Sequence, residues 1–250
     1  YEILTSNFTP TGLAAPVDAD RMAVLPFGQE PEPPRWNLYG EPVEIYEGTQ
    51  VILRDTAGMI SPLSQPGALL RLIENVSGNP DLALRAMDTL ADWQDEDDLK
   101  RLHGAESWDY RAAGLGYVPR NSYIQCISEM RLIKGFDDAL MDAIEKNLAY
   151  WPTEDTNYLT MSEELLRTIL QDDERTDQIL QFRRNGALTP EVFTAVTGIL
   201  PGPESVFFPS GRIDVTVISS EGSAQIRISA VVSKHEIHRK KPFTVNQWRR

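Results

Sequence analysis

The spacing of apolar residues changes twice along this chain of 250 residues, and the order of the changes limits the folds that it can adopt. The segment from Val43 to Asp55 has the composition of a strand, with the apolar run Val51-Ile52-Leu53. From Pro66 to about Thr197 apolar residues recur at helical spacing, and from Ile213 onward they alternate with polar ones. The order strand, helices, strands predicts an α+β fold.

The C-terminal part is predicted to form an antiparallel hairpin followed by a third strand. The hairpin turns at Glu221-Gly222, and the third strand begins near Phe243 and ends near Trp248. Apolar residues occupy alternate positions on both sides of the turn, which is typical of a half-buried sheet. They are Ile213, Val215, Val217, Ala224, Ile226, Ile228, Ala230 and Val232.

The early strand around Val51 is expected to pair with this hairpin, because a solitary strand leaves its backbone amides without partners. The helical block then becomes an insertion in a β-sheet domain. The predicted parts are residues 1–65, an N-terminal extended segment with the first strand; residues 66–203, the insertion, with subdomains at about 66–150 and 151–203; and residues 204–250, the closing strands. The alternative is two successive domains, one helical and one β.

Local signals mark the ends of the predicted helices. Helix starts are expected at Asn79-Pro80, Asp137 and Thr189-Pro190, and Thr160 with Glu163 fits a capping box. Asn185-Gly186 is expected to end a helix. The stretch from Thr9 to Pro42 is predicted to be a loop, because its many prolines discourage helices and inner strands.

The composition argues against several classes of function. A net charge of −13 repels nucleic-acid phosphates and anionic lipids, and no apolar run approaches the roughly 20 residues that span a bilayer. The single cysteine, Cys126, allows no intrachain disulfide. The sequence also lacks a Gly-x-Ser-x-Gly elbow and a phosphate-binding glycine loop, so we expect that the protein is not an enzyme.

Acidic residues are concentrated between Asp92 and Asp98, shortly before Gly104-Ala105-Glu106. Like charges this close together repel one another, and a hard divalent cation such as Ca²⁺ removes that cost by binding six to eight oxygens. The spacing is not that of an EF-hand, because Leu99 and Lys100 stand where a ligand and the turn glycine belong. Two interpretations stay open: an irregular calcium loop, or a solvated acidic helix end.

A second local pattern, Leu132-Ile133-Lys134-Gly135-Phe136, has the form of a helix-hairpin-helix turn, whose amides can hold a DNA phosphate. Here Asp137-Asp138 follows at once and would repel a phosphate at that position. The pattern therefore favours a structural turn, with a nucleic-acid-binding module as the alternative function. A hydrolase that uses the acidic cluster with a metal is a further alternative.

The acidic stretch and the residues after it also form a recognisable signature. Asp92-Trp93-x-Asp95-x-Asp97, then Gly104-Ala105-Glu106 and Tyr110, resemble the signature of the K-type minor pseudopilin family of type II protein secretion systems. Ser128 to Gly135 and Leu53 to Ile60 resemble two more family segments, the latter a strand that ends in Asp-x-x-Gly, which corresponds here to Asp55 to Gly58. Asn157 and Thr160 keep two positions of a further family motif whose other positions differ, so the second part of the insertion is expected to be divergent.

The resemblance implies a pilin-like antiparallel β-sheet domain with a large all-α insertion, built from SAM-like or helix-hairpin-helix-like subdomains. It implies calcium as a cofactor, with Asp95, Asp97 and Glu106 as the first ligand candidates and Asp92 and Asp109 behind them. It implies a place at the tip of the periplasmic pseudopilus, in complex with the I-type and J-type minor pseudopilins. Secreted exoproteins or the outer-membrane channel are further expected partners, nucleic acid is not, and an N-terminal helix outside this chain would anchor the protein in the inner membrane.

Overall fold

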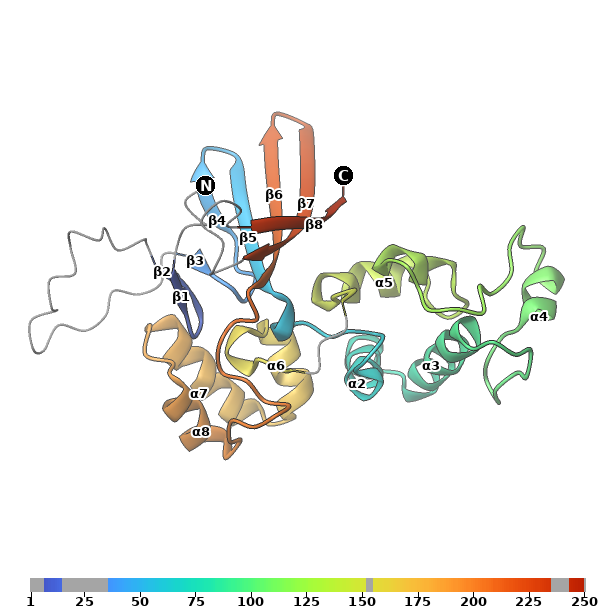
Figure 1. Ribbon diagram of the computed structural model, residues 1–250, viewed down its shortest axis with the longest axis horizontal. Coiled ribbons are helices and arrows are strands. Elements are labelled where there is room, and N and C mark those ends of the chain that lie inside the picture. The colour runs from blue at the N-terminus through green and yellow to red at the C-terminus, as the bar shows by residue number, and fades with distance from the viewer. Residues whose placement is uncertain (1–6, 15–35, 152–154, 235–242, 250) are drawn as a thin grey trace, which may run out of the picture. The chain divides into compact units, whose positions relative to one another are not determined.

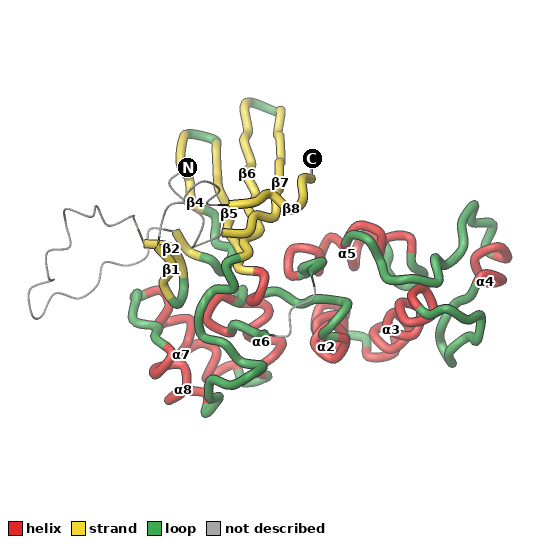
Figure 2. The backbone as a smooth tube through the Cα atoms, viewed as in Figure 1, coloured by secondary structure: helices red, strands yellow, loops and turns green. Residues whose placement is uncertain are grey.

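The computed structural model describes residues 7–14, 36–151, 155–234 and 243–249, and the chain divides into two compact units. One unit, here called the sheet unit, joins Tyr1–Met59 to Glu154–Arg250, and the other, the helical unit, consists of Ile60–Thr153. Figure 2 shows that the strands of the described residues lie in the sheet unit, while helices occur in both. The structure is therefore α+β, as the sequence predicts.

A five-stranded antiparallel sheet is the frame of the sheet unit (Figure 1). Its strands, in spatial order, are β4 (Val43–Tyr46), β5 (Thr49–Asp55), β6 (Arg212–Glu221), β7 (Ala224–Lys234) and β8 (Phe243–Arg249). The pairing of β5 with β6 runs from Thr49 opposite Ser219 to Asp55 opposite Ile213. The expected pairing of the early strand with the C-terminal hairpin is therefore confirmed.

Two details near the N-terminus differ from the sequence prediction. The segment from Val43 to Asp55 is a hairpin of two strands, because Gly48 has a φ of +72° and lets the chain reverse. Part of the proline-rich stretch, predicted to be a loop, forms a small antiparallel sheet of β1 (Asn7–Thr9), β2 (Gly12–Ala14) and β3 (Trp36–Asn37). Residues 15–35 of that stretch, and residues 235–242 before the last strand, lie outside the described residues.

The core of the sheet unit forms on one face of β5 and β6. Val51 and Leu53 are buried at alternate positions of β5, opposite Val217 and Val215 of β6. The buried cluster consists of Trp36, Leu38, Val51, Leu53 and Ile213, with Val43, Val215 and Val217 packed against it. Burying each such aliphatic side chain contributes about 1.5–3 kcal/mol. The half-buried pattern predicted for the hairpin does not hold along all of β7, because Ala224, Ile226 and Ile228 are exposed.

Among the described residues, three α-helices belong to the same unit as the sheet: α6 (Glu163–Leu170), α7 (Asp173–Arg184) and α8 (Pro190–Thr197). Figure 1 shows them gathered beyond one end of the strands. Thr189 caps α8 and Asn185 follows the end of α7, as predicted. The cap of α6 is Ser162 and not Thr160, so the capping box expected at Thr160 is wrong.

Thr160 has another role, because its hydroxyl donates to the buried carboxylate of Asp55 at 3.0 Å. The same Oδ2 atom accepts from Nδ2 of Asn157 at 3.2 Å, while Oδ1 accepts from the backbone N–H and hydroxyl of Ser210. Burial raises the pKa of Asp55, and hydrogen bonds from Ser210, Thr160 and Ala57 oppose that rise. The end of β5 is thereby joined to two segments more than a hundred residues later.

The helical unit contains α2 (Pro66–Ser77), α3 (Pro80–Gln94), α4 (Ser107–Ala112) and α5 (Asp138–Ile144). The predicted caps Asn79 and Asp137 begin α3 and α5. Where the chain enters and leaves this unit, Ile60 and Leu148 form a parallel bridge, with hydrogen bonds between Ile60 and both Asn147 and Ala149 at 2.9 Å. None of the helices that the structure describes is both long enough and apolar enough to cross a bilayer.

Candidate metal centre

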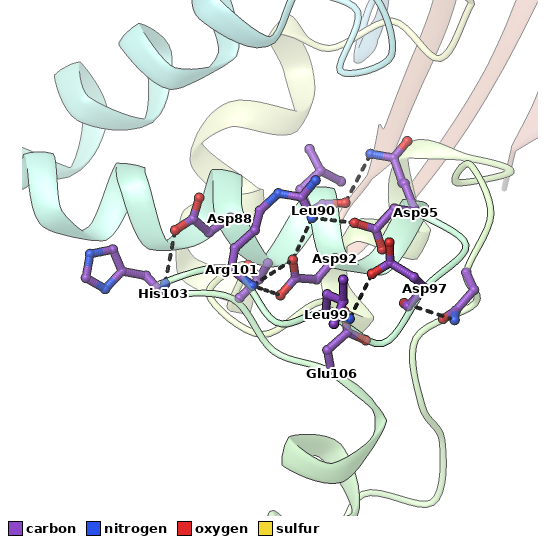
Figure 3. A network of polar contacts seen from close by, with 12 residues as sticks. Asp88, Leu90, Asp92, Asp95, Asp97, Leu99, Arg101, His103 and Glu106 are labelled. Carbon is purple, nitrogen blue, oxygen red and sulfur yellow. Dashed lines mark hydrogen bonds and ion pairs between the residues drawn. The ribbon is translucent and has the colours of Figure 1, made fainter.

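The predicted metal ligands lie at one corner of the helical unit, between the end of α3 and the start of α4 (Figure 3). Asp92 is on the inward face of the last turn of α3, and it has no exposed surface. A buried carboxylate at a helix C-terminus is unfavourable, because the helix dipole places partial negative charge there as well. Asp92 therefore needs a strong positive partner.

Arg101 supplies that partner. Its Nη1 atom lies 2.7 Å from Oδ1 of Asp92 and also contacts Oδ2 of Asp95. Its backbone N–H donates to both carboxylate oxygens of Asp92, at 3.3 and 3.2 Å. One residue of the loop thus binds two of the predicted ligands, through its side chain and its backbone.

Glu106, just before α4, is the residue of the corner whose charge is least compensated. It is 5% exposed and faces the backbone N–H of Asp109 in a capping box, but neither of its carboxylate oxygens makes a hydrogen bond of good geometry within the described part of the chain. Burial, together with the negative charges of Asp92, Asp95, Asp98 and Asp97, raises the pKa of Glu106 to about 7. Oδ1 of Asp95 is likewise buried without a partner among these residues.

The other two predicted ligands are engaged within the protein. Oδ1 of Asp97 accepts from the backbone N–H of Leu99 at 2.8 Å. Asp109 binds Lys100 at 2.6 Å and accepts from the backbone N–H of Glu106, and both contacts lower its pKa. In the described residues, no three His, Cys, Asp or Glu side chains come together as a metal-binding group.

A layer of aromatic residues continues from this corner into the helical unit. Trp93, next to Asp92, donates from Nε1 to Glu129 at 3.1 Å, and Glu129 also binds Nε of Arg120 at 2.7 Å. The rings of Trp93 and Tyr110 lie 5.7 Å apart, at 52° to each other. The signature residues Trp93 and Tyr110 therefore pack together and position the neighbouring carboxylates of Asp92 and Glu106.

The hairpin around Gly135 packs against this frame. Lys134 donates its backbone N–H to the hydroxyl of Tyr110 at 3.0 Å, and its carbonyl accepts from Thr89 at 2.6 Å. Gly135 has a φ of +94°, and a Cβ atom there would lie 3.4 Å from the Cα atom of Ala86. These contacts give the hairpin a structural role, and nothing in them favours the nucleic-acid alternative.

Oxygen donors such as these suit a hard divalent cation. The fit is supported by the three buried oxygens of Asp95 and Glu106 that lack hydrogen-bond partners in the described residues, since a cation can satisfy them. Sequence reasoning missed Arg101. The available signal was the pair Lys100-Arg101, two cations in a run of carboxylates.

The chain is similar to known proteins in sequence. Residues 53–153 match the profile of a family described as "Type II secretion system (T2SS), protein K". A protein of Klebsiella pneumoniae named "Type II secretion system protein K" is 43% identical over 70 residues, which are 28% of this chain and 22% of that protein. The match thus spans about a fifth of the length of this relative.

The fold also has a solved counterpart. A chain in the crystal structure of the GspK-GspI-GspJ complex, from the type 2 secretion system of enterotoxigenic Escherichia coli, aligns with a TM-score of 0.55. The alignment covers 84% of this chain and 82% of the other, at 16% sequence identity. At this sequence identity the match shows a similar fold and no more: an antiparallel sheet combined with helices.

Proposed function

Through residues 53–153 this chain belongs to the type II secretion system protein K family, and from this premise we propose that it is a minor pseudopilin that takes part in protein secretion. The observation that carries the proposal is the agreement between that match and the structure. The matched residues begin in β5 and cover the helical unit, where the signature residues Asp92, Trp93, Glu106 and Tyr110 form one corner.

We propose that the protein acts by assembly and not by catalysis. The sheet unit would continue the pseudopilus, and the helical unit would add bulk that suits a position at its tip. The proposed partners are the I-type and J-type minor pseudopilins, because the chain of similar fold comes from a complex with GspI and GspJ in its name. Secreted proteins or the outer-membrane channel would meet the exposed surface of the tip.

The proposed location is the periplasmic side of the inner membrane, where the pseudopilus is built. An N-terminal helix of the full-length protein would supply the membrane anchor. The acidic surface of this chain, with a net charge of −13, suits contact with proteins better than contact with anionic lipid.

We further propose that the acidic corner holds calcium. Asp95 and Glu106 would hold the ion first, since they carry the buried oxygens without hydrogen-bond partners in the described residues, with Asp92, Asp97 and Asp109 nearby. A bound Ca²⁺ neutralises carboxylates and accepts oxygen ligands at flexible angles. The loop between α3 and α4 would be fixed by these residues, so the role of the site is structural.

The assembly proposal can be tested by size-exclusion chromatography with light scattering. The purified chain is mixed with the soluble domains of the I-type and J-type pseudopilins of the same secretion system, together and one at a time. We expect one peak that contains all three proteins. Three separate peaks at micromolar concentration would refute the proposal.

The same preparation tests the nucleic-acid alternative. Fluorescence anisotropy with labelled duplex DNA at 50 mM salt should show no salt-sensitive binding, and Lys134→Ala should therefore change nothing. The backbone of Lys134 is held by Tyr110 and Thr89, and its Nζ atom donates to the carbonyl of Asp109.

A further inference from the structure

The guanidinium of Arg101 lies between the carboxylates of Asp92 and Asp95 in the acidic corner (Figure 3). It bridges Asp92, which is fully buried, and Asp95, which is partly exposed. The side chain of Arg101 is itself 42% exposed, so it reaches into the corner from the surface. The guanidinium of Arg101 thus already neutralises the carboxylates of Asp92 and Asp95, which a bound cation would also neutralise.

The loop does not depend on this guanidinium for its attachment. The backbone N–H of Arg101 donates to both oxygens of Asp92. On the other side of the loop, the backbone N–H of His103 donates to Asp88 at 3.1 Å. The side chain of Arg101 can therefore turn out to solvent while the backbone keeps its contacts with α3.

One guanidinium does not satisfy the corner. Three buried oxygens, on Asp95 and Glu106, have no hydrogen-bond partner in the described residues. The neighbouring cation, Lys100, binds Asp109. The corner thus keeps acceptor oxygens for a second cation, but the oxygens of Asp92 and Asp95 are shared with Arg101.

We propose that Arg101 is the resident counter-ion of this corner and that a divalent cation binds by displacing its guanidinium from Asp92 and Asp95. The inference rests on the proposed calcium role. Two cations at one set of carboxylates repel each other strongly where little water separates them. Arg101 therefore lowers the affinity of the corner for calcium, and it keeps the corner folded when calcium is scarce.

The first test is isothermal titration calorimetry with calcium chloride on the wild type, Arg101→Met and Arg131→Met. Arg131 is a matched control, since it also binds several carboxylates of the helical unit, Asp138, Asp142 and Glu145, away from the corner. We expect the Kd of Arg101→Met to fall at least about tenfold, which corresponds to about 1.4 kcal/mol. The Kd of Arg131→Met should stay within about twofold of the wild type, because its charge change lies elsewhere.

The second test needs no variant that might fail to fold without calcium. In the wild-type protein, NMR signals of the arginine Nε–Hε groups are followed during a calcium titration. We expect the signal of Arg101 to move to the position and exchange rate of a solvated arginine, while that of Arg131 stays unchanged.

The outcomes separate the inference from the proposal on which it rests. If the wild type binds calcium, and Arg101→Met binds it equally or more weakly while the Arg101 signal does not move, Arg101 is not displaced and the inference is wrong. If the wild type and Arg101→Met both bind no calcium at millimolar concentration, the calcium role itself fails.

Discussion

A Cβ atom on Gly104 would lie 1.8 Å from Oδ2 of Asp92, so the loop after α3 can close over this carboxylate only where a residue has no side chain. Gly104 needs no unusual backbone angle. The requirement is one of space, because the contact is with a fully buried group that cannot move aside.

We expect Gly104→Ala to lower the free energy of unfolding by about 2–3 kcal/mol, as forced overpacking does. The measurement is urea unfolding monitored by tryptophan fluorescence, since Trp93 adjoins Asp92. Gly116→Ala is the control: a Cβ atom there meets nothing within 4 Å, and the variant should unfold like the wild type. Equal stability of the two variants would show that the loop relaxes around Asp92.

Calcium should stabilise the protein through the acidic corner. At a calcium concentration a hundred times Kd, linkage adds about 2.7 kcal/mol to the free energy of unfolding. A thermal melt with and without a chelator measures this, and Asp95→Ala should abolish the calcium effect. Asp138 is an exposed partner of Arg131, and Asp138→Ala removes the same charge as Asp95→Ala. This control variant should keep the calcium effect. Melting that ignores calcium in the wild type would contradict the proposed site.

Glu129 should make stability depend on pH. Burial alone would raise its pKa, but hydrogen bonds from Gln125, Arg120 and Trp93 outweigh this and lower it below 4.5. A lowered folded pKa means that the stabilisation is present above pH 4.5 and is lost as the pH falls through the folded value.

We therefore expect Glu129→Gln to cost about 2 kcal/mol at pH 7, and the difference from the wild type should shrink as the pH falls below about 4.5. Urea titrations at pH 7, 5 and 3 would show this. The exposed Glu163, paired with Arg167, is the comparison, and Glu163→Gln should change stability by less than about 1 kcal/mol at each pH. A constant difference across the pH range would contradict the role of the Glu129 charge.

Asp55 should tolerate no amide in place of its carboxylate. Both of its oxygens accept hydrogen bonds, from Ser210 on one side and from Asn157 and Thr160 on the other. Asp55→Asn turns one acceptor into a donor that faces other donors, so we expect a loss of about 2–4 kcal/mol in the free energy of unfolding, although a buried charge is removed. Urea unfolding of this variant and of the exposed control Glu221→Gln gives the comparison. Similar stability of the two variants would show that the hydrogen bonds of Asp55 do not stabilise the fold.

Arg183 is a buried cation that binds carbonyl groups. Its Nη1 donates to the carbonyl of Met161 at 2.8 Å, its Nη2 to that of Leu159 at 3.3 Å, and its guanidinium lies 4.4 Å from the ring centre of Tyr39. A lysine cannot reproduce this planar fork, so Arg183→Lys should cost about 2–3 kcal/mol. The neighbouring Arg184 is exposed, and Arg184→Lys should be neutral in the same chemical unfolding assay.

Local signals predicted local structure well. The caps at Asn79, Asp137 and Thr189 and the alternating strands after Ile213 are in place, because short-range hydrogen bonds and the period of apolar residues decide them. The prediction of a cap at Thr160 is wrong because the partner of its hydroxyl, Asp55, lies 105 residues earlier in the chain. The single strand predicted from Val43 to Asp55 is two strands with a turn at Gly48, which the composition of the segment does not show.

The acidic corner could be found from its carboxylates, but its internal order could not. That Asp92 is buried, that Arg101 binds it, and that Glu106 lacks a hydrogen-bond partner in the described residues all depend on how the loop folds back on α3. The sequence likewise did not predict that α6, α7 and α8 pack in one unit with the sheet, because helix spacing says which face is apolar and not what covers it.

The bridge between Ile60 and Leu148 has a consequence for how such a protein can change over evolutionary time. Because both ends of the helical unit meet at one pair of residues, insertions or rebuilt loops within it leave the spacing of its two connections unaltered. Changes within the helical unit then do not alter the register of the strands in the sheet unit. The sheet unit can therefore keep its structure while the helical unit changes in size or sequence.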